Sequence, residues 1–140
     1  MQGDLFRAVN DDGYFIDIIR PMQKNDASAE EYDLGGIVPV GIDGLKWLVD
    51  SPRFQATAIG EDGLPVWLSC IDPRAFALHK LWVSKQDSRE RLKRRRDAVQ
   101  AVAVAQVAEL LGMKFDAKEL SALPAALLDG WKQLMAHPSK

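Results

Sequence analysis

The residues of this chain best suited to bind a charged ligand are cations and a carboxylate that share one helical stripe. Arg89, Lys93, Asp97 and Gln100 follow one another at spacings of three or four residues, and Lys80 lies on the preceding predicted helix. Such a stripe can offer cations to phosphate oxygens while its aspartate orients a neighbouring base. The same charge pattern is also typical of a solvated helix face with ion pairs, so both interpretations stay open on pattern alone.

A second candidate is Asp17, a carboxylate in the middle of a predicted strand. Alternation places Asp17 on the same strand face as Phe15 and Ile19. Burial of an ionised carboxylate without a partner costs several kcal/mol. Asp17 must therefore reach water, a hydrogen-bond donor, a basic group or a metal ion.

Composition limits the classes of protein that need to be considered. The chain has 140 residues, 47% of them hydrophobic, and a formal net charge of −2, which excludes a globally basic nucleic-acid binder but not a local basic patch. A single cysteine, Cys70, excludes an internal disulfide. No signal peptide and no membrane-spanning stretch is evident in the sequence, so we expect a cytoplasmic protein without a membrane partner.

The elements that would position these residues change from strands to helices along the chain. Two hairpins are predicted, residues 5–9 with 14–20 and residues 54–59 with 64–70, each around a turn that ends in glycine. Residues 22–36 are expected to form a loop, followed by a short apolar run, 37–42, and a short helix that ends before Pro52.

Helical periodicity begins after Pro73 and predicts helices over residues 73–85 and 88–111, with Gly112 as a C-cap. A last helical region over 116–137 is expected to be interrupted near Pro124. We therefore predict one α+β domain over residues 1–140, mainly strands over 5–70 and mainly helices over 73–137. The two hairpins would form a small mixed or antiparallel sheet, followed by a C-terminal bundle of about three helices. The four tryptophans are expected mainly in the core.

Three segments together resemble the C-terminal two-thirds of a bacterial family of predicted nucleotidyltransferases with the polymerase-beta-like fold. They read GYFIDIIRP, GLKWLVDSPRFQATAIGEDGLPV and DPRAFALHKLWVSKQDSRERLKRRRDAVQA, and the match runs from Val9 to about Ala105. The resemblance implies a partial nucleotidyltransferase fold. It also implies transfer of a nucleoside monophosphate from a Mg²⁺-bound nucleoside triphosphate (NTP) to a hydroxyl acceptor.

The resemblance also assigns roles to individual residues of this chain. Asp17 matches the family's third acid and would be a catalytic residue and the ligand of Mg²⁺. Lys80, Arg89 and Lys93 would bind the nucleotide phosphates, with Lys80 also counted as catalytic. Asp97 would belong to the catalytic set as the residue that orients these cations.

The family pattern includes a Gly-Ser turn and an Asp-x-Asp strand before the third acid, and neither motif occurs in these 140 residues. We therefore expect the 140-residue chain by itself to be inactive, whether it is a piece of a longer protein or a remnant with another role. The alternative is a non-catalytic regulatory module whose basic helix, residues 89–96, contacts nucleic acid or an acidic partner. A third possibility is a homodimer, or addition of a partner's strand, at an exposed sheet edge.

Overall fold

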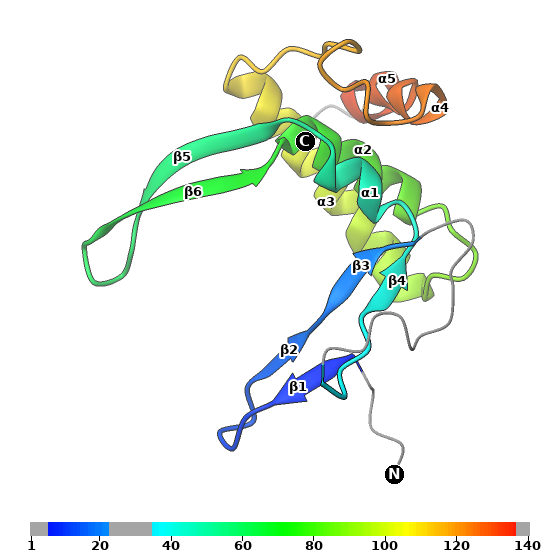
Figure 1. Cartoon of the computed structure of the whole chain (residues 1–140). Coiled ribbons are helices and arrows are strands. Elements are labelled where there is room, and N and C mark those ends of the chain that lie inside the picture. Colours follow the sequence, from blue (N-terminus) through cyan, green and yellow to red (C-terminus); the bar gives the residue numbers. More distant parts are fainter. Residues whose placement is uncertain (1–5, 23–34, 137–140) are drawn as a thin grey trace. The chain divides into compact units, whose positions relative to one another are not determined.

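A computed structural model describes residues 6–22 and 35–136 and gives the α+β class that the sequence predicts (Figure 1). Contacts within the chain separate it into two compact units, residues 1–46 and 47–140. Each unit is described by itself. That the 140 residues fold as one domain stays a prediction.

The first unit begins with the predicted hairpin. Strands β1 (Arg7–Val9) and β2 (Phe15–Asp17) pair antiparallel, with Arg7 opposite Asp17. The turn closes through a 3.0 Å hydrogen bond from the Gly13 amide to the Asn10 carbonyl, and Gly13 adopts a φ of 78° that other residues avoid. Turn chemistry therefore sets the register of this hairpin.

Ile18 divides the predicted strand 14–20 into two strands with different partners. Its amide donates to the Phe6 carbonyl, and its carbonyl accepts from the Val40 amide, at 2.8 and 3.1 Å. Beyond it, β3 (Ile19–Pro21) pairs in parallel with β4 (Val40–Ile42). The expected loop over residues 22–36 lies largely outside the described residues.

The second unit carries the longer hairpin. The short helix α1 (Leu45–Val49) leads into it, and β5 (Arg53–Ile59) pairs antiparallel with β6 (Pro65–Ile71) as the sequence predicts. Figure 1 shows this pair as a ribbon that extends away from the helices of its unit. The prediction that tryptophans are core residues is wrong for Trp67, which is 65% exposed on β6, in a two-stranded sheet.

Two long helices form the centre of the second unit. Helix α2 (Pro73–Val83) starts at Asp72, whose side chain accepts a 2.8 Å hydrogen bond from the Arg74 amide. Helix α3 (Arg91–Leu110) ends before Gly112. The N-terminal boundary of α3 lies three residues after the predicted position.

The last helical region is shorter and more broken than the sequence predicts. Residues 117–123 form turns, in which Asp116 accepts hydrogen bonds from the Lys118 and Glu119 amides at 2.7 and 3.3 Å. Two short helices follow Pro124, namely α4 (Ala125–Leu128) and α5 (Gly130–Met135).

The core lies between α2, α3 and the C-terminal helices, where small residues allow close contact. A Cβ atom on Gly130 would lie 2.9 Å from a methyl group of Leu81, so a larger residue there would require the Leu81 side chain to move. The buried apolar residues are Leu48, Ala75, Ala77, Leu78, Leu81, Ala101, Ala105, Ala108, Leu120, Leu123, Trp131 and Leu134.

Replacement of Gly112 by alanine is expected to lower the free energy of unfolding by about 1 kcal/mol. Gly112 has a φ of 77°, and no atom lies within 4 Å of a Cβ added there, so the cost is backbone strain alone. Asparagine tolerates this conformation better than alanine, so Gly112→Asn should lose clearly less. Urea unfolding measures both; equal stability of all three chains would contradict a left-handed C-cap.

Candidate phosphate-binding site

Asp97 is the centre of a charged cluster in the second unit. Its side chain is 0% exposed, and it accepts a 2.8 Å hydrogen bond from Lys80 Nζ and a 2.9 Å hydrogen bond from Arg89 Nε. A buried carboxylate is stable only when cations and hydrogen bonds compensate its lost hydration. The cluster, defined as Lys80, Arg89 and Asp97, meets that requirement with one cation at each oxygen.

Three separate elements supply these side chains. Asp97 lies in the second turn of α3 on the face toward α2, since Ala101, Ala105 and Ala108 continue that face and are all buried. Lys80 lies in the last turn of α2. Arg89 lies in the segment that joins the two helices.

The predicted helical stripe is therefore correct for Asp97 but wrong for Arg89. Because α3 begins at Arg91, Arg89 is not helical, and its backbone is instead fixed by a 3.1 Å hydrogen bond to the Gln86 carbonyl. The structure still brings Arg89 and Asp97 together, because the segment between α2 and α3 places Arg89 next to Asp97. Cations from two elements converge on one acid, which favours the interpretation of an organised cluster over that of a solvated face.

Burial opposes ionisation of Asp97, and the two cations outweigh it. Desolvation by itself raises the pKa of the Asp97 carboxyl, but the hydrogen bonds from Lys80 and Arg89 hold this pKa below its ordinary value. Asp97 is consequently an anion at neutral pH. Its negative charge offsets the electrostatic repulsion between the Lys80 and Arg89 cations.

Lys93 and Gln100 do not join this cluster. The Lys93 ammonium lies 3.0 Å from Glu90, and its side chain is 51% exposed. Gln100 is exposed as well, and Arg94 lies 3.6 Å from Asp87. For this outer part of the stripe the interpretation as a solvated face with ion pairs is the better one.

Both cations of the cluster keep part of their surface in water. The side chain of Lys80 is 20% exposed and that of Arg89 is 35% exposed, whereas Asp97 is inaccessible. The Lys80 ammonium also lies 5.5 Å from the centre of the Phe76 ring. An anion that approaches this surface would therefore meet two positioned cations before it meets the carboxylate.

Asp17 has a different partner, Arg7, in the first unit. Arg7 Nε and Nη2 donate to the two carboxylate oxygens at 2.6 and 2.9 Å, and the Arg7 guanidinium lies 4.4 Å from the Phe15 ring centre. The hydrogen bonds from Arg7 hold the pKa of Asp17 below its ordinary value. Of the partners open to Asp17 from its sequence, the described structure supplies a basic group.

Arg7 is not among the candidate residues predicted from the sequence, although the hairpin contains the signal for its pairing with Asp17. Asn10 and Tyr14 lie opposite each other at the turn of this hairpin. Three residues further from the turn on each strand, Arg7 therefore lies opposite Asp17. Cross-strand pairs of opposite charge on one face are a common means of stabilising a hairpin.

The described residues do not by themselves fit a magnesium site. No group of three or more Asp, Glu, His or Cys side chains that could hold a metal ion occurs within residues 6–22 and 35–136. Mg²⁺ requires six oxygen ligands in near-octahedral geometry. Asp17 could supply at most one carboxylate to these six ligands, and its two oxygens already accept hydrogen bonds from Arg7.

Comparison with known proteins now identifies the class of this chain. A family model described as "Nucleotidyltransferase" matches residues 2–123, which include Asp17 and the whole cluster. The chain belongs to this nucleotidyltransferase family. No curated protein and no solved structure matches it. Within the part of the chain that the structure describes, every helix is too short or too polar to span a membrane.

Proposed function

We propose that this domain binds the triphosphate of an NTP through Lys80 and Arg89. We further propose that it serves transfer of a nucleoside monophosphate to a hydroxyl acceptor. The observation that carries the proposal is the buried Asp97 carboxylate, which holds two partly exposed cations from separate elements in one place. Membership of the nucleotidyltransferase family supplies the reaction class.

Phosphate oxygens suit this cluster because its cations are already positioned. Two cations and one carboxylate leave a net charge of +1 on the cluster, on the side that water reaches. Charge-assisted hydrogen bonds to a phosphate are stronger than neutral ones, and a planar guanidinium matches two of its oxygens. Lys93 lies four residues before Asp97 on α3 and would add a weaker, screened attraction if it exchanged Glu90 for phosphate.

Asp17 enters the proposal as one carboxylate of a metal site that these 140 residues do not complete. Arg7 would have to release Asp17 before a metal ion could bind there, because it donates to both oxygens. The proposed contribution of this chain is to bind and orient the triphosphate.

Substitution of Arg89 tests the proposal without removing the buried acid. Arg89→Gln should weaken binding of inorganic tripolyphosphate and of Mg-ATP about tenfold or more, because a charge-assisted hydrogen bond is worth about 1.5–3 kcal/mol. Isothermal titration calorimetry measures both dissociation constants. The melting temperature should also fall, because one oxygen of the buried Asp97 loses its cation, so binding is compared at a temperature at which circular dichroism shows both chains folded.

Arg95→Gln is the matched control. It removes the same charge from an exposed position on α3, so binding should change less than about twofold. Equal losses for both variants would mean that the basic helix attracts anions by net charge alone. That result would favour the alternative of a nucleic-acid or partner-binding module over residues 89–96.

A further inference from the structure

The long hairpin β5–β6 has one face that is entirely apolar. Cross-strand register puts three pairs on this face, Phe54 with Cys70, Ala56 with Leu68, and Ala58 with Val66. The opposite face is mixed: it carries the polar residues Gln55, Ser69 and Thr57 together with the exposed apolar residues Trp67 and Ile59. Of the apolar face, Phe54, Val66 and Leu68 are exposed. Contiguous water-exposed apolar patches can mark interaction surfaces.

Helix α3 carries a second uncovered apolar surface. Val99, Ala103, Val107 and Leu110 recur at spacings of three or four residues and are all exposed, Leu110 to 86%. Arg96 continues this stripe toward the start of the helix, three residues before Val99. Leu92, four residues before Arg96, continues the stripe and is 75% exposed, so Arg96 is a basic position within an otherwise apolar stripe.

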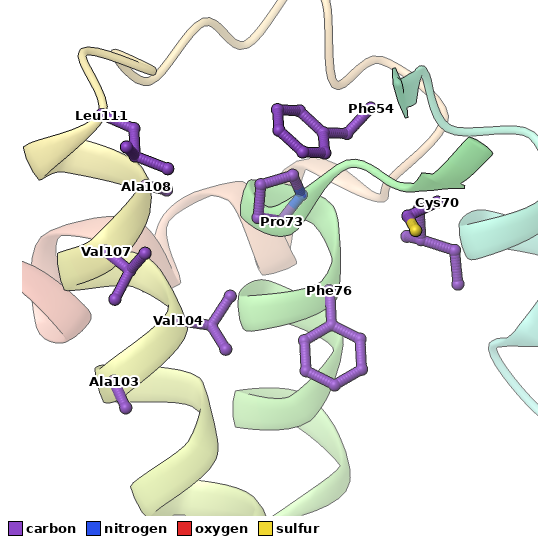
Figure 2. A pocket seen from close by; sticks show the side chains of 10 residues that line it. Phe54, Cys70, Pro73, Phe76, Ala103, Val104, Val107, Ala108 and Leu111 are labelled. Carbon is purple, nitrogen blue, oxygen red and sulfur yellow. The ribbon is translucent and has the colours of Figure 1, made fainter. Parts of the chain in front are cut away.

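The two surfaces meet at one pocket, of about 420 Å³. Figure 2 shows Phe54 and Cys70 of the hairpin, Val107 of α3, and Leu111 directly after α3 lining it. From this junction the hairpin and α3 diverge (Figure 1). Neither surface therefore covers the other beyond the pocket.

The surfaces match each other in length and in charge. From Phe54 to the turn residue Glu61 the hairpin spans about 23 Å, and from Leu110 to Arg96 the helix spans about 21 Å. The hairpin ends in the acidic pair Glu61 and Asp62, and the α3 stripe contains Arg96, with Arg95 beside it, near its N-terminal end. If the hairpin of one chain lay along α3 of another with the base of the hairpin at Leu110, the apolar face of the hairpin would contact the apolar stripe. The acidic turn would then lie near Arg96.

We infer that a second copy of this chain covers both surfaces, with the hairpin of each protomer laid along α3 of the other. A two-fold axis that bisects the directions of hairpin and helix exchanges these two directions, as a symmetric dimer of this kind requires. Each acidic turn then faces the partner's Arg96. This inference is independent of nucleotide binding.

Sedimentation equilibrium of the 140-residue chain tests the inference. The expected species at micromolar concentration has twice the 15.6 kDa mass of one chain. Leu68→Lys should raise the dimer dissociation constant about a hundredfold or more, because it buries an unpaired charge in the interface. Leu68 is exposed in one protomer, so the circular dichroism of the variant should be unchanged. Thr57→Lys, on the opposite face, is the control and should leave the dimer intact.

A charge exchange distinguishes this dimer from other assemblies. Asp62→Arg should weaken it, and the further substitution Arg96→Glu should restore it, since each turn would again face an opposite charge. A chain that stays at 15.6 kDa even at millimolar concentration would overturn the inference and leave these surfaces to another partner. A dimer that resists Leu68→Lys, or that the exchange does not restore, would also overturn it and indicate pairing at a strand edge.

Discussion

The 140-residue chain by itself is expected to transfer no nucleotide from any of the four NTPs. Its sequence contains no Asp-x-Asp and no Gly-Ser motif, and its described residues include no group of acids able to hold a metal ion. With Asp17 alone, Mg²⁺ would stay with water and the triphosphate oxygens, and charge at the reacting phosphorus would not be neutralised by a fixed site. Transfer of labelled nucleotide, assayed with an active family member alongside, measures this.

The complementary experiment extends the chain at its N-terminus with a Gly-Ser and Asp-x-Asp segment from that active member. Activity should appear in the extended chain, and Asp17→Asn should then abolish it while the circular dichroism stays unchanged. Asp11→Asn, in the exposed hairpin turn, is the control and should keep full activity. Strong turnover by the original 140 residues would show that other acids of this chain bind the metal ion.

Substitution of Asp97 should have the largest effect on stability. Asp97→Asn keeps the shape of the side chain but leaves Lys80 and Arg89 without their anion, so the free energy of unfolding at pH 7 should fall by about 2–3 kcal/mol. The control is Glu109→Gln, which removes an exposed acid from the same helix and should change stability by less than about 0.5 kcal/mol. Urea unfolding at fixed pH measures each value.

The pH dependence of that loss identifies its cause. Because the folded-state pKa of Asp97 lies below its ordinary value, the ionised carboxylate stabilises the fold above about pH 4. This stabilisation disappears as the pH falls through the folded-state pKa. The difference between wild type and Asp97→Asn should therefore be constant near neutrality and shrink at pH 3. A difference that is the same at pH 3 and pH 7 would attribute the loss to packing.

Local sequence signals predict the two hairpins well and the longer-range pairing poorly. The turn glycines Gly13 and Gly63 take the positive φ values that tight turns need, so strand positions follow from the turns. Ile18 is different, because its change of partner depends on β4, which begins 22 residues later in the sequence. Alternation within residues 14–20 contains no signal for that change.

The sequence predicts which residues belong to the candidate site better than it predicts which of them contact one another. Helical spacing linked Arg89, Lys93 and Asp97, but only the helix boundary and the packing of α2 decide which of them meet. A usable signal was present: Asp97 is followed at helical spacing by Ala101 and Ala105, which marks its face as buried. A charged residue on an alanine face needs a partner, and Lys80 on the neighbouring helix supplies one.

The most direct test of phosphate binding at the cluster is a nuclear magnetic resonance titration of the chain with Mg-ATP, followed at the arginine Nε–H and lysine Nζ signals. The account predicts saturable shifts at Arg89 and Lys80, smaller ones at Lys93, and none at the exposed Arg95 beyond a salt effect. Shifts of equal size along residues 89–96, or saturable binding that leaves Arg89 and Lys80 unchanged, would contradict it.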